Sequence, residues 1–150
     1  MYKLSAAACA AWLGLFSLAT HAQTASRMID PTPYCGNEGV WIQILGGGGP
    51  ELNDDEAQAS YVVFLDNRAR LLVDAAPGSS YLFDRAGARI GDLEAIALTN
   101  VRADRTADLP ALVGGGVLAE RDRLLAILGP DAAGAYPDTE TLILRLMGPD

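Results

Sequence analysis

Residues 98–112 read LTNVRADRTADLPAL, and this stretch decides the fold of the 150-residue chain. It begins at the end of a nearly continuous apolar run, Leu93–Thr99, which predicts a buried central strand. A helix is expected from about Thr106 to Val113, with Thr106 as its N-cap and Asp108 in its first turn. The polar residues in between therefore form a loop that connects a strand to a helix.

The rest of the sequence predicts a hairpin followed by alternating helices and strands. Asn67-Arg68 fits a tight hairpin turn. The glycines Gly114–Gly116 predict the end of the helix that begins at Thr106, here called the central helix. This order favours an α+β fold in which a mixed sheet carries helices on one face. The remaining predicted strands are Val40–Leu45, Ser60–Asp66, Ala69–Ala75 and Leu124–Leu128, and the remaining predicted helices run from Ser79 or Ser80, as N-cap, to Ala86 and over Thr139–Met147.

Residues 1–22 have the pattern of a secretory signal peptide. Lys3 precedes the apolar run Leu4–Leu18, and small residues flank His21. The run is short for a membrane anchor, so we expect cleavage and no membrane attachment afterwards. The expected location is secreted or periplasmic in a bacterium, with an irregular lead-in over residues 23–39 and one domain over residues 40–150.

The charge and the cysteine content of the chain without its leader limit the ligands and the disulfides that it can have. The remaining chain has ten arginines, no lysine and 19 acidic residues, which excludes the clustered positive charge of a nucleic-acid-binding protein. It has no histidine, because His21 lies in the leader. Cys35 is its one cysteine, so it forms no intrachain disulfide. A buried free thiol and a link between two chains both stay open.

Five segments, in chain order, carry a family resemblance: ILGGGGPEL (Ile44–Leu52), SYVVFLDNRARLLVDAAPGS (Ser60–Ser79), AGARIGDLEAIALT (Ala86–Thr99), residues 98–112 and ILGPD (Ile127–Asp131). Together they resemble the metallo-β-lactamase superfamily, in particular its secreted ribonuclease Z-like and arylsulfatase-like branch. The resemblance implies an αββα sandwich, of which this chain contains only the first half, a sheet with its helices.

The family signature LTHxHxDHxxDLPxL contributes to the binding of two zinc or manganese ions, through its histidines and through the aspartate of its Asp-His pair. Here Asn100, Arg102 and Arg105 stand at three of the histidine positions, and only Asp104 and Asp108 keep the family's residue types. A guanidinium stays protonated and has no free lone pair for a metal. We therefore expect no metal cofactor, with Asp104 as the one remaining ligand and candidate catalytic residue.

The arginines suggest a substitute for the metal ions. Arg102 and Arg105 would form ion pairs with Asp104, Asp108 and Asp74, where Asp74 matches the aspartate that the family places beside its metal pocket. The alternative is an exposed loop whose arginines point into water.

Three functions stay open at this stage. The first is a truncated, inactive pseudoenzyme of a secreted hydrolase family with a degenerate zinc site. The second is a binding or assembly module, which pairs with itself or with a second-half polypeptide through an uncovered apolar sheet face. The third is a weak hydrolase of esters or phosphodiesters, which would use Asp74, Asp104 and Asp108 with magnesium or manganese.

Overall fold

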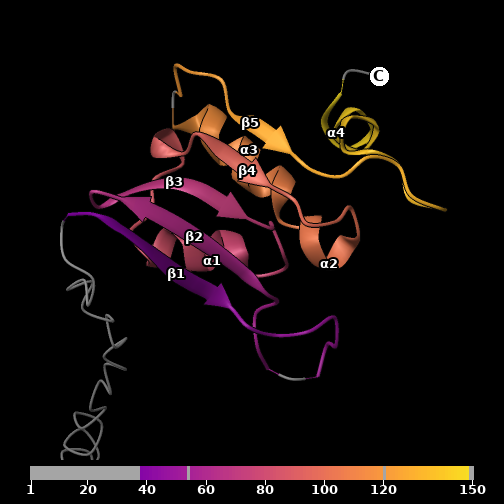
Figure 1. Ribbon diagram of the computed structural model, residues 1–150, viewed down its shortest axis with the longest axis horizontal. Coiled ribbons are helices and arrows are strands. Elements are labelled where there is room, and N and C mark those ends of the chain that lie inside the picture. The colour runs from indigo at the N-terminus through magenta and orange to yellow at the C-terminus, as the bar shows by residue number, and fades with distance from the viewer. Residues whose placement is uncertain (1–37, 54, 120, 149–150) are drawn as a thin grey trace, which may run out of the picture. The chain divides into compact units, whose positions relative to one another are not determined.

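The computed structural model describes residues 38–53, 55–119 and 121–148 (Figure 1). The predicted signal peptide over residues 1–22 lies outside the described residues, as do Cys35 and all but the end of the predicted lead-in over residues 23–39. In the part of the chain that is described, no helix has the length and apolar character needed to cross a membrane.

Five of the described segments are strands, and they form one mixed sheet (Figure 1). In spatial order, which is also chain order, the strands are β1 (Val40–Gly46), β2 (Ser60–Leu65), β3 (Arg68–Val73), β4 (Ala95–Ala97) and β5 (Ala126–Leu128). The pairs β1–β2 and β2–β3 are antiparallel, whereas β3–β4 and β4–β5 are parallel. The predicted α+β class with a mixed sheet is confirmed.

The β2–β3 hairpin turns at Asp66-Asn67, one residue earlier than predicted. Both residues have positive φ angles, 49° and 60°, as a two-residue type I′ turn requires. Asn and Asp tolerate this conformation better than other residues with a Cβ, which explains why the turn settles on them and not on Arg68. The Asp66 carboxylate also accepts a hydrogen bond from the Gly39 amide at 2.9 Å, which joins the turn to the start of β1.

Four α-helices and a short 3₁₀ helix accompany the sheet. They are α1 (Ser79–Arg85), η1 (Ile90–Asp92), α2 (Ala103–Thr106), α3 (Leu109–Leu118) and α4 (Thr139–Met147). α4 has the predicted bounds. The N-cap of α1 is Gly78, at φ 88°, so neither Ser79 nor Ser80 caps it as predicted.

The central helix predicted over Thr106–Val113 is wrong at both ends. Thr106 closes α2, where its hydroxyl donates to the Arg102 carbonyl at 3.0 Å, and α3 begins only after Asp108. α3 then continues through Gly114–Gly116. Each glycine inside a helix costs only about 1 kcal/mol relative to alanine. The burial of apolar residues earlier in α3 outweighs that cost.

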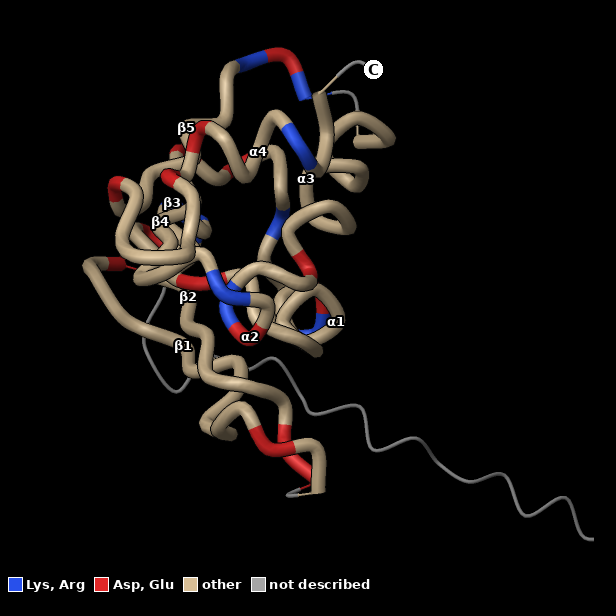
Figure 2. Tube along the Cα trace, turned by 90° about the vertical axis from the view of Figure 1, so that its right-hand side faces the viewer, with Lys and Arg blue, Asp and Glu red and all other residues tan. Residues whose placement is uncertain are grey.

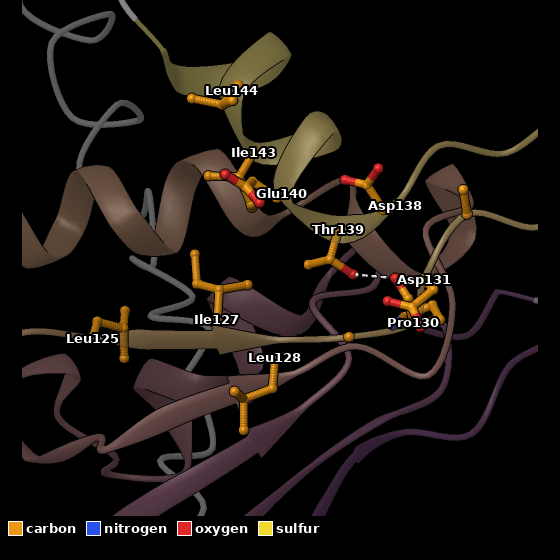
Figure 3. Close-up of a pocket in the computed structure, with 12 residues that line it drawn as sticks. Leu125, Ile127, Leu128, Pro130, Asp131, Asp138, Thr139, Glu140, Ile143 and Leu144 are labelled. Carbon is orange, nitrogen blue, oxygen red and sulfur yellow. Dashed lines mark hydrogen bonds between the residues drawn. The ribbon is translucent and has the colours of Figure 1, made fainter.

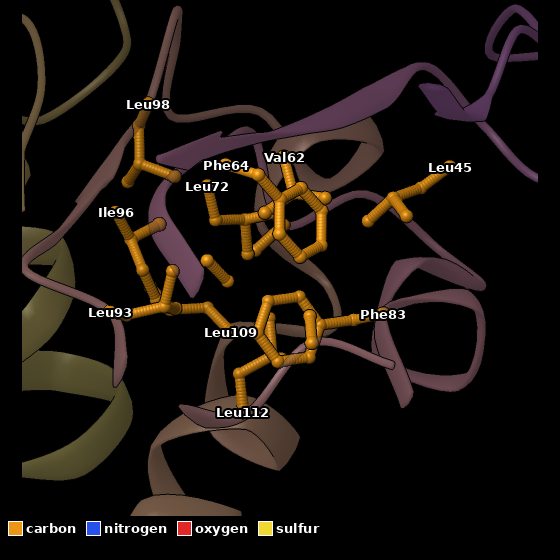
Figure 4. Close-up of a cluster of buried hydrophobic side chains, with 13 residues drawn as sticks. Leu45, Val62, Phe64, Leu72, Phe83, Leu93, Ile96, Leu98, Leu109 and Leu112 are labelled. Atoms are coloured by element: carbon orange, nitrogen blue, oxygen red, sulfur yellow. The ribbon is translucent and has the colours of Figure 1, made fainter. Parts of the chain in front are cut away.

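The inner face of the sheet packs against α1 and α3 to form the core (Figure 4). Side chains alternate along a strand, so Val62 and Phe64 of β2 share this face with Leu72 of β3 and Ile96 of β4. Phe83 of α1 and Leu109 and Leu112 of α3 lie against them and are buried. α4 adds Leu142, Ile143 and Met147 at the β5 end of the core.

The opposite face, here called the outer face, is apolar as well. Arg68, the register partner of Leu65, also lies on this face, at its hairpin end. The apolar members, read from the strand register, are Val40, Ile42, Ile44, Tyr61, Val63, Leu65, Leu71, Val73, Ala95, Ala97, Ala126 and Leu128. The three on β1 are exposed by 72%, 59% and 68%, and Leu128 by 56%. The sheet therefore has two apolar faces, and the helices that build the core lie against only one of them.

Candidate functional site

The residues that the sequence singles out gather where β3 and β4 end. These neighbouring strands are parallel, so their carboxyl ends meet at one edge of the sheet. Asp74 follows β3 directly, and the segment from Thr99 to α2 follows β4. Figure 2 shows acidic and basic residues side by side at α2.

Asp74 ties the two strand ends together. Its Oδ1 accepts hydrogen bonds from the Thr99 amide at 2.7 Å and the Thr99 hydroxyl at 3.0 Å, and Oδ2 lies 2.8 Å from the same hydroxyl. Asp74 is only 5% exposed and has a φ angle of 60°, a left-handed conformation that costs a residue with a Cβ about 1 kcal/mol. The Ser60 hydroxyl donates to the Asp74 carbonyl and so helps to hold this conformation.

Arg105 lies between two carboxylates. Its Nε is 3.7 Å from Asp74 Oδ2 and 3.8 Å from Asp104 Oδ2, and its Nη1 donates to the Ala59 carbonyl at 3.2 Å. The side chain is 21% exposed, so water screens these ion pairs less than it screens pairs on the surface. Arg105 thus links the residue before β2, the residue after β3 and α2 through a single guanidinium.

Arg102 and Asn100 occupy the more exposed side of the site. Arg102 Nε lies 2.9 Å from Asp104 Oδ1, and the Arg102 side chain is 49% exposed. The Asn100 amide oxygen accepts a hydrogen bond from the Arg102 backbone amide at 2.9 Å. Asn100 therefore stabilises the local turn with the same oxygen that would otherwise be its ligand atom.

Asp108 does not join the ion pairs of Arg102 and Arg105 in the described structure, contrary to the predicted pairing. Its Oδ2 accepts hydrogen bonds from the Ser80 amide at 2.9 Å and the Ser80 hydroxyl at 2.8 Å. Ser80 lies in the first turn of α1, where unpaired backbone amides attract a negative charge. Asp108 therefore fastens the start of α1 to the start of α3.

The donor atoms at this site do not fit a metal ion. Among residues 38–53, 55–119 and 121–148, no three His, Cys, Asp or Glu side chains come close enough to hold one. Asp74 is engaged by Thr99 and Arg105, and Asp104 by two arginines. The trio required for carboxylate-based hydrolysis, Asp74, Asp104 and Asp108, is not brought together, because Asp108 is turned toward α1.

Sequence reasoning missed the hydroxyl partners of this site. Thr99, Ser60 and Ser80 donate to Asp74 or Asp108, yet none of them was expected to take part. Only the position of Thr99 carried a signal, because a residue just after β4 lies beside one just after β3 in parallel neighbours. The contacts of Ser60 and Ser80 depend on hairpin register and helix packing.

Comparisons with known proteins identify the fold. No protein-family model and no curated protein matches the chain. It is similar to the crystal structure of the metallo-β-lactamase fold protein YhfI from Bacillus subtilis, with a TM-score of 0.54 and 22% identity over 62% of this chain and 37% of that one. It is also similar to a diphosphatase of the PhnP family, with a TM-score of 0.54 and 18% identity over 72% of this chain and 46% of that one.

The chain therefore spans less than half the length of these solved structures. The matching part consists of a mixed sheet with its helices, as the sequence resemblance predicts. At these identities the likeness concerns the fold and not the chemistry. The protein has part of the metallo-β-lactamase fold.

Proposed function

We propose that this protein is a secreted or periplasmic pseudoenzyme of the metallo-β-lactamase fold, without a hydrolytic metal centre. The observation that carries the proposal is the position of Arg105, whose guanidinium lies within 4 Å of the carboxylates of both Asp74 and Asp104. Hydrolysis by this fold relies on metal ions that generate a hydroxide. A guanidinium supplies no such nucleophile and repels a divalent cation.

The ion pairs also supply a structural reason for the arginines. Without a cation, Asp74 and Asp104 would face one another as like charges near a partly buried strand end. Arg105 offsets both charges and adds a hydrogen bond to Ala59, and Arg102 holds the outer oxygen of Asp104. In this proposal the guanidinium groups of Arg102 and Arg105 take the place of the two metal ions of the family. The carboxylates keep cationic partners, but the metal ions that would catalyse hydrolysis are lost.

Metal titration tests the proposal directly. Isothermal calorimetry with zinc and with manganese, combined with turnover of phosphodiester, arylsulfate and β-lactam substrates, should show neither stoichiometric binding nor hydrolysis. Tight binding of two ions by the unaltered protein, or metal-dependent turnover, would refute it.

A variant designed to gain zinc binding adds a positive control to this test. The triple change Asn100→His, Arg102→His and Arg105→His places three imidazoles on the existing loop and should confer zinc binding. The matched control, with alanine at the same three positions, removes the arginines equally but supplies no ligand. Equal zinc binding by both variants would mean that the loop does not hold the metal.

The outer face favours a second candidate function, an assembly module. Twelve apolar residues from five strands form this face, with one charged residue, Arg68, beside the hairpin turn. So large an apolar area is unusual for a sheet face in contact with water. A second layer, from another copy of the chain or from a separate polypeptide with its own sheet, would cover it. This role is compatible with an inactive metal site.

Sedimentation velocity shows whether the second layer comes from another copy of the chain or from a separate polypeptide. A dimer of the chain alone identifies a second copy, and Ile42→Asp with Ile44→Asp should then return it to a monomer, because both side chains lie on the outer face. Val117→Asp is the matched control, since Val117 is 76% exposed on α3 and away from this face. A folded monomer that binds no second sheet would exclude this role.

A further inference from the structure

β5 has a free edge. It is the last strand of the sheet, so in the described structure it pairs only with β4. The Ala126 amide donates to the Glu94 carbonyl at 3.2 Å, and the Leu98 amide donates to the Leu128 carbonyl at 2.7 Å. Backbone groups alternate along a strand, so the amide and carbonyl of Ile127 point away from β4. They are available to another strand.

A groove of 710 Å³ follows this edge, between β5 and α4. Its apolar part includes Leu125 and Ile127 of the β5 segment and Ile143 and Leu144 of α4. Figure 3 shows Ile127 and Ile143 on facing sides of the groove, whereas Leu128 points to the other face of the sheet. The Thr139 hydroxyl donates to the Pro130 carbonyl at 2.9 Å and fixes the start of α4 beside the end of β5.

One end of the groove is acidic. Asp131, Asp138 and Glu140 line it where β5 ends and α4 begins, and no lysine or arginine lines it. Asp138 already accepts hydrogen bonds from Thr141, so Asp131 and Glu140 supply the charge for a ligand. A second copy of this chain, with a net charge of −8, would be repelled here. The groove therefore favours a partner with a positive charge.

We propose that the β5–α4 groove binds an extended apolar peptide with an arginine or lysine at one end. The peptide adds to β5 as a sixth strand, with hydrogen bonds to the backbone of Ile127. Its inward side chains contact Ile127, Ile143 and Leu144, and its cation lies near Asp131 and Glu140. The proposal is independent of the metal site, because none of these residues belongs to that site.

Fluorescence anisotropy with synthetic peptides tests the proposal. The probe is a short labelled peptide of alternating valine and threonine with an arginine at one end, and a second probe carries glutamate in place of arginine. We expect saturable binding of the arginine probe. The double variant Asp131→Asn and Glu140→Gln should weaken it about fivefold, the effect of two exposed charge pairs. The matched control, Glu51→Gln with Asp84→Asn, removes two exposed carboxylates that do not line the groove.

Backbone methylation of the probe separates strand addition from simple apolar contact. Methyl groups on the amides that face β5 should abolish binding, whereas methyl groups on the alternate amides should leave it intact. The proposal fails if no probe saturates the protein below about 1 mM. It also fails if the glutamate probe binds as well as the arginine probe, or if methylation at the two sets of amides has the same effect.

Discussion

Two neighbouring arginines of one loop have unequal roles. Arg105 is 21% exposed and contacts Asp74, Asp104 and the Ala59 carbonyl, whereas Arg102 is 49% exposed and pairs with Asp104. The sequence predicts that arginine replaces imidazole, but it does not rank the two. Their difference arises from the position of Ala59, just before β2, whose carbonyl is a third partner for Arg105.

We therefore expect Arg105→Ala to lower the free energy of unfolding by about 2 kcal/mol, because it leaves a buried carboxylate without its cation. Arg102→Ala should cost less than about 1 kcal/mol, as is usual for an exposed pair. Urea denaturation of both variants measures the difference. Equal losses would show that the two ion pairs are equally screened by water.

The bounds of α4 were predicted to the residue, whereas those of the helices that follow β4, α2 and α3, were not. α4 carries strong local signals, because Pro137-Asp138 precedes it and the Asp138 side chain accepts a hydrogen bond from the Thr141 amide at 2.6 Å. The start of α3 depends on Asp108, whose carboxylate is directed to another helix. A local pattern cannot show that contact, so it placed the cap at Thr106.

The stability of α4 should depend on pH through Asp138. The backbone amide of Thr141, followed by the Thr141 hydroxyl, donates to the carboxylate and lowers the pKa of Asp138 below its ordinary value. A carboxylate whose pKa is lower in the folded state than in the unfolded state adds stability at pH values above its unfolded-state pKa. This stability is lost as the pH falls through the folded-state pKa. The protection factors of the α4 amides, which correct hydrogen-exchange rates for the intrinsic effect of pH, should therefore fall in acid. Asp138→Asn keeps a capping oxygen without the titration and should remove that dependence.

The glycine run of α3, Gly114–Gly116, lowers the stability of that helix. A Cβ at Gly114 or Gly115 would meet nothing within 4 Å, and both glycines lie inside the helix. Gly114→Ala with Gly115→Ala should raise the free energy of unfolding by about 1 to 2 kcal/mol, since alanine loses less backbone entropy than glycine. A loss of stability in urea denaturation would mean that the glycines are needed for a contact beyond the described residues.

In the sheet as a whole, the hairpin and the parallel strands could be predicted from the sequence because they have local signals. The turn signal around Asn67 predicts the antiparallel hairpin, although it placed the turn one residue late, and the alternating helices and strands predict the parallel pairs. The Asp74–Arg105 pair was predicted as a candidate on the basis of the resemblance. The groove beside β5 was not, because it results from how α4 packs against the strand and leaves no pattern in the sequence.

Among the described strands, β1 forms the other border of the sheet, and its composition has a consequence for handling the protein. The strand reads VWIQILG, with neither charge nor proline, and Val40, Ile42 and Ile44 are exposed. Such a border is a template for cross-β stacking into fibrils. We expect concentrated protein to develop thioflavin T fluorescence, and Gln43→Lys to suppress it, because a lysine on this strand would place repelling charges at each repeat of a fibril.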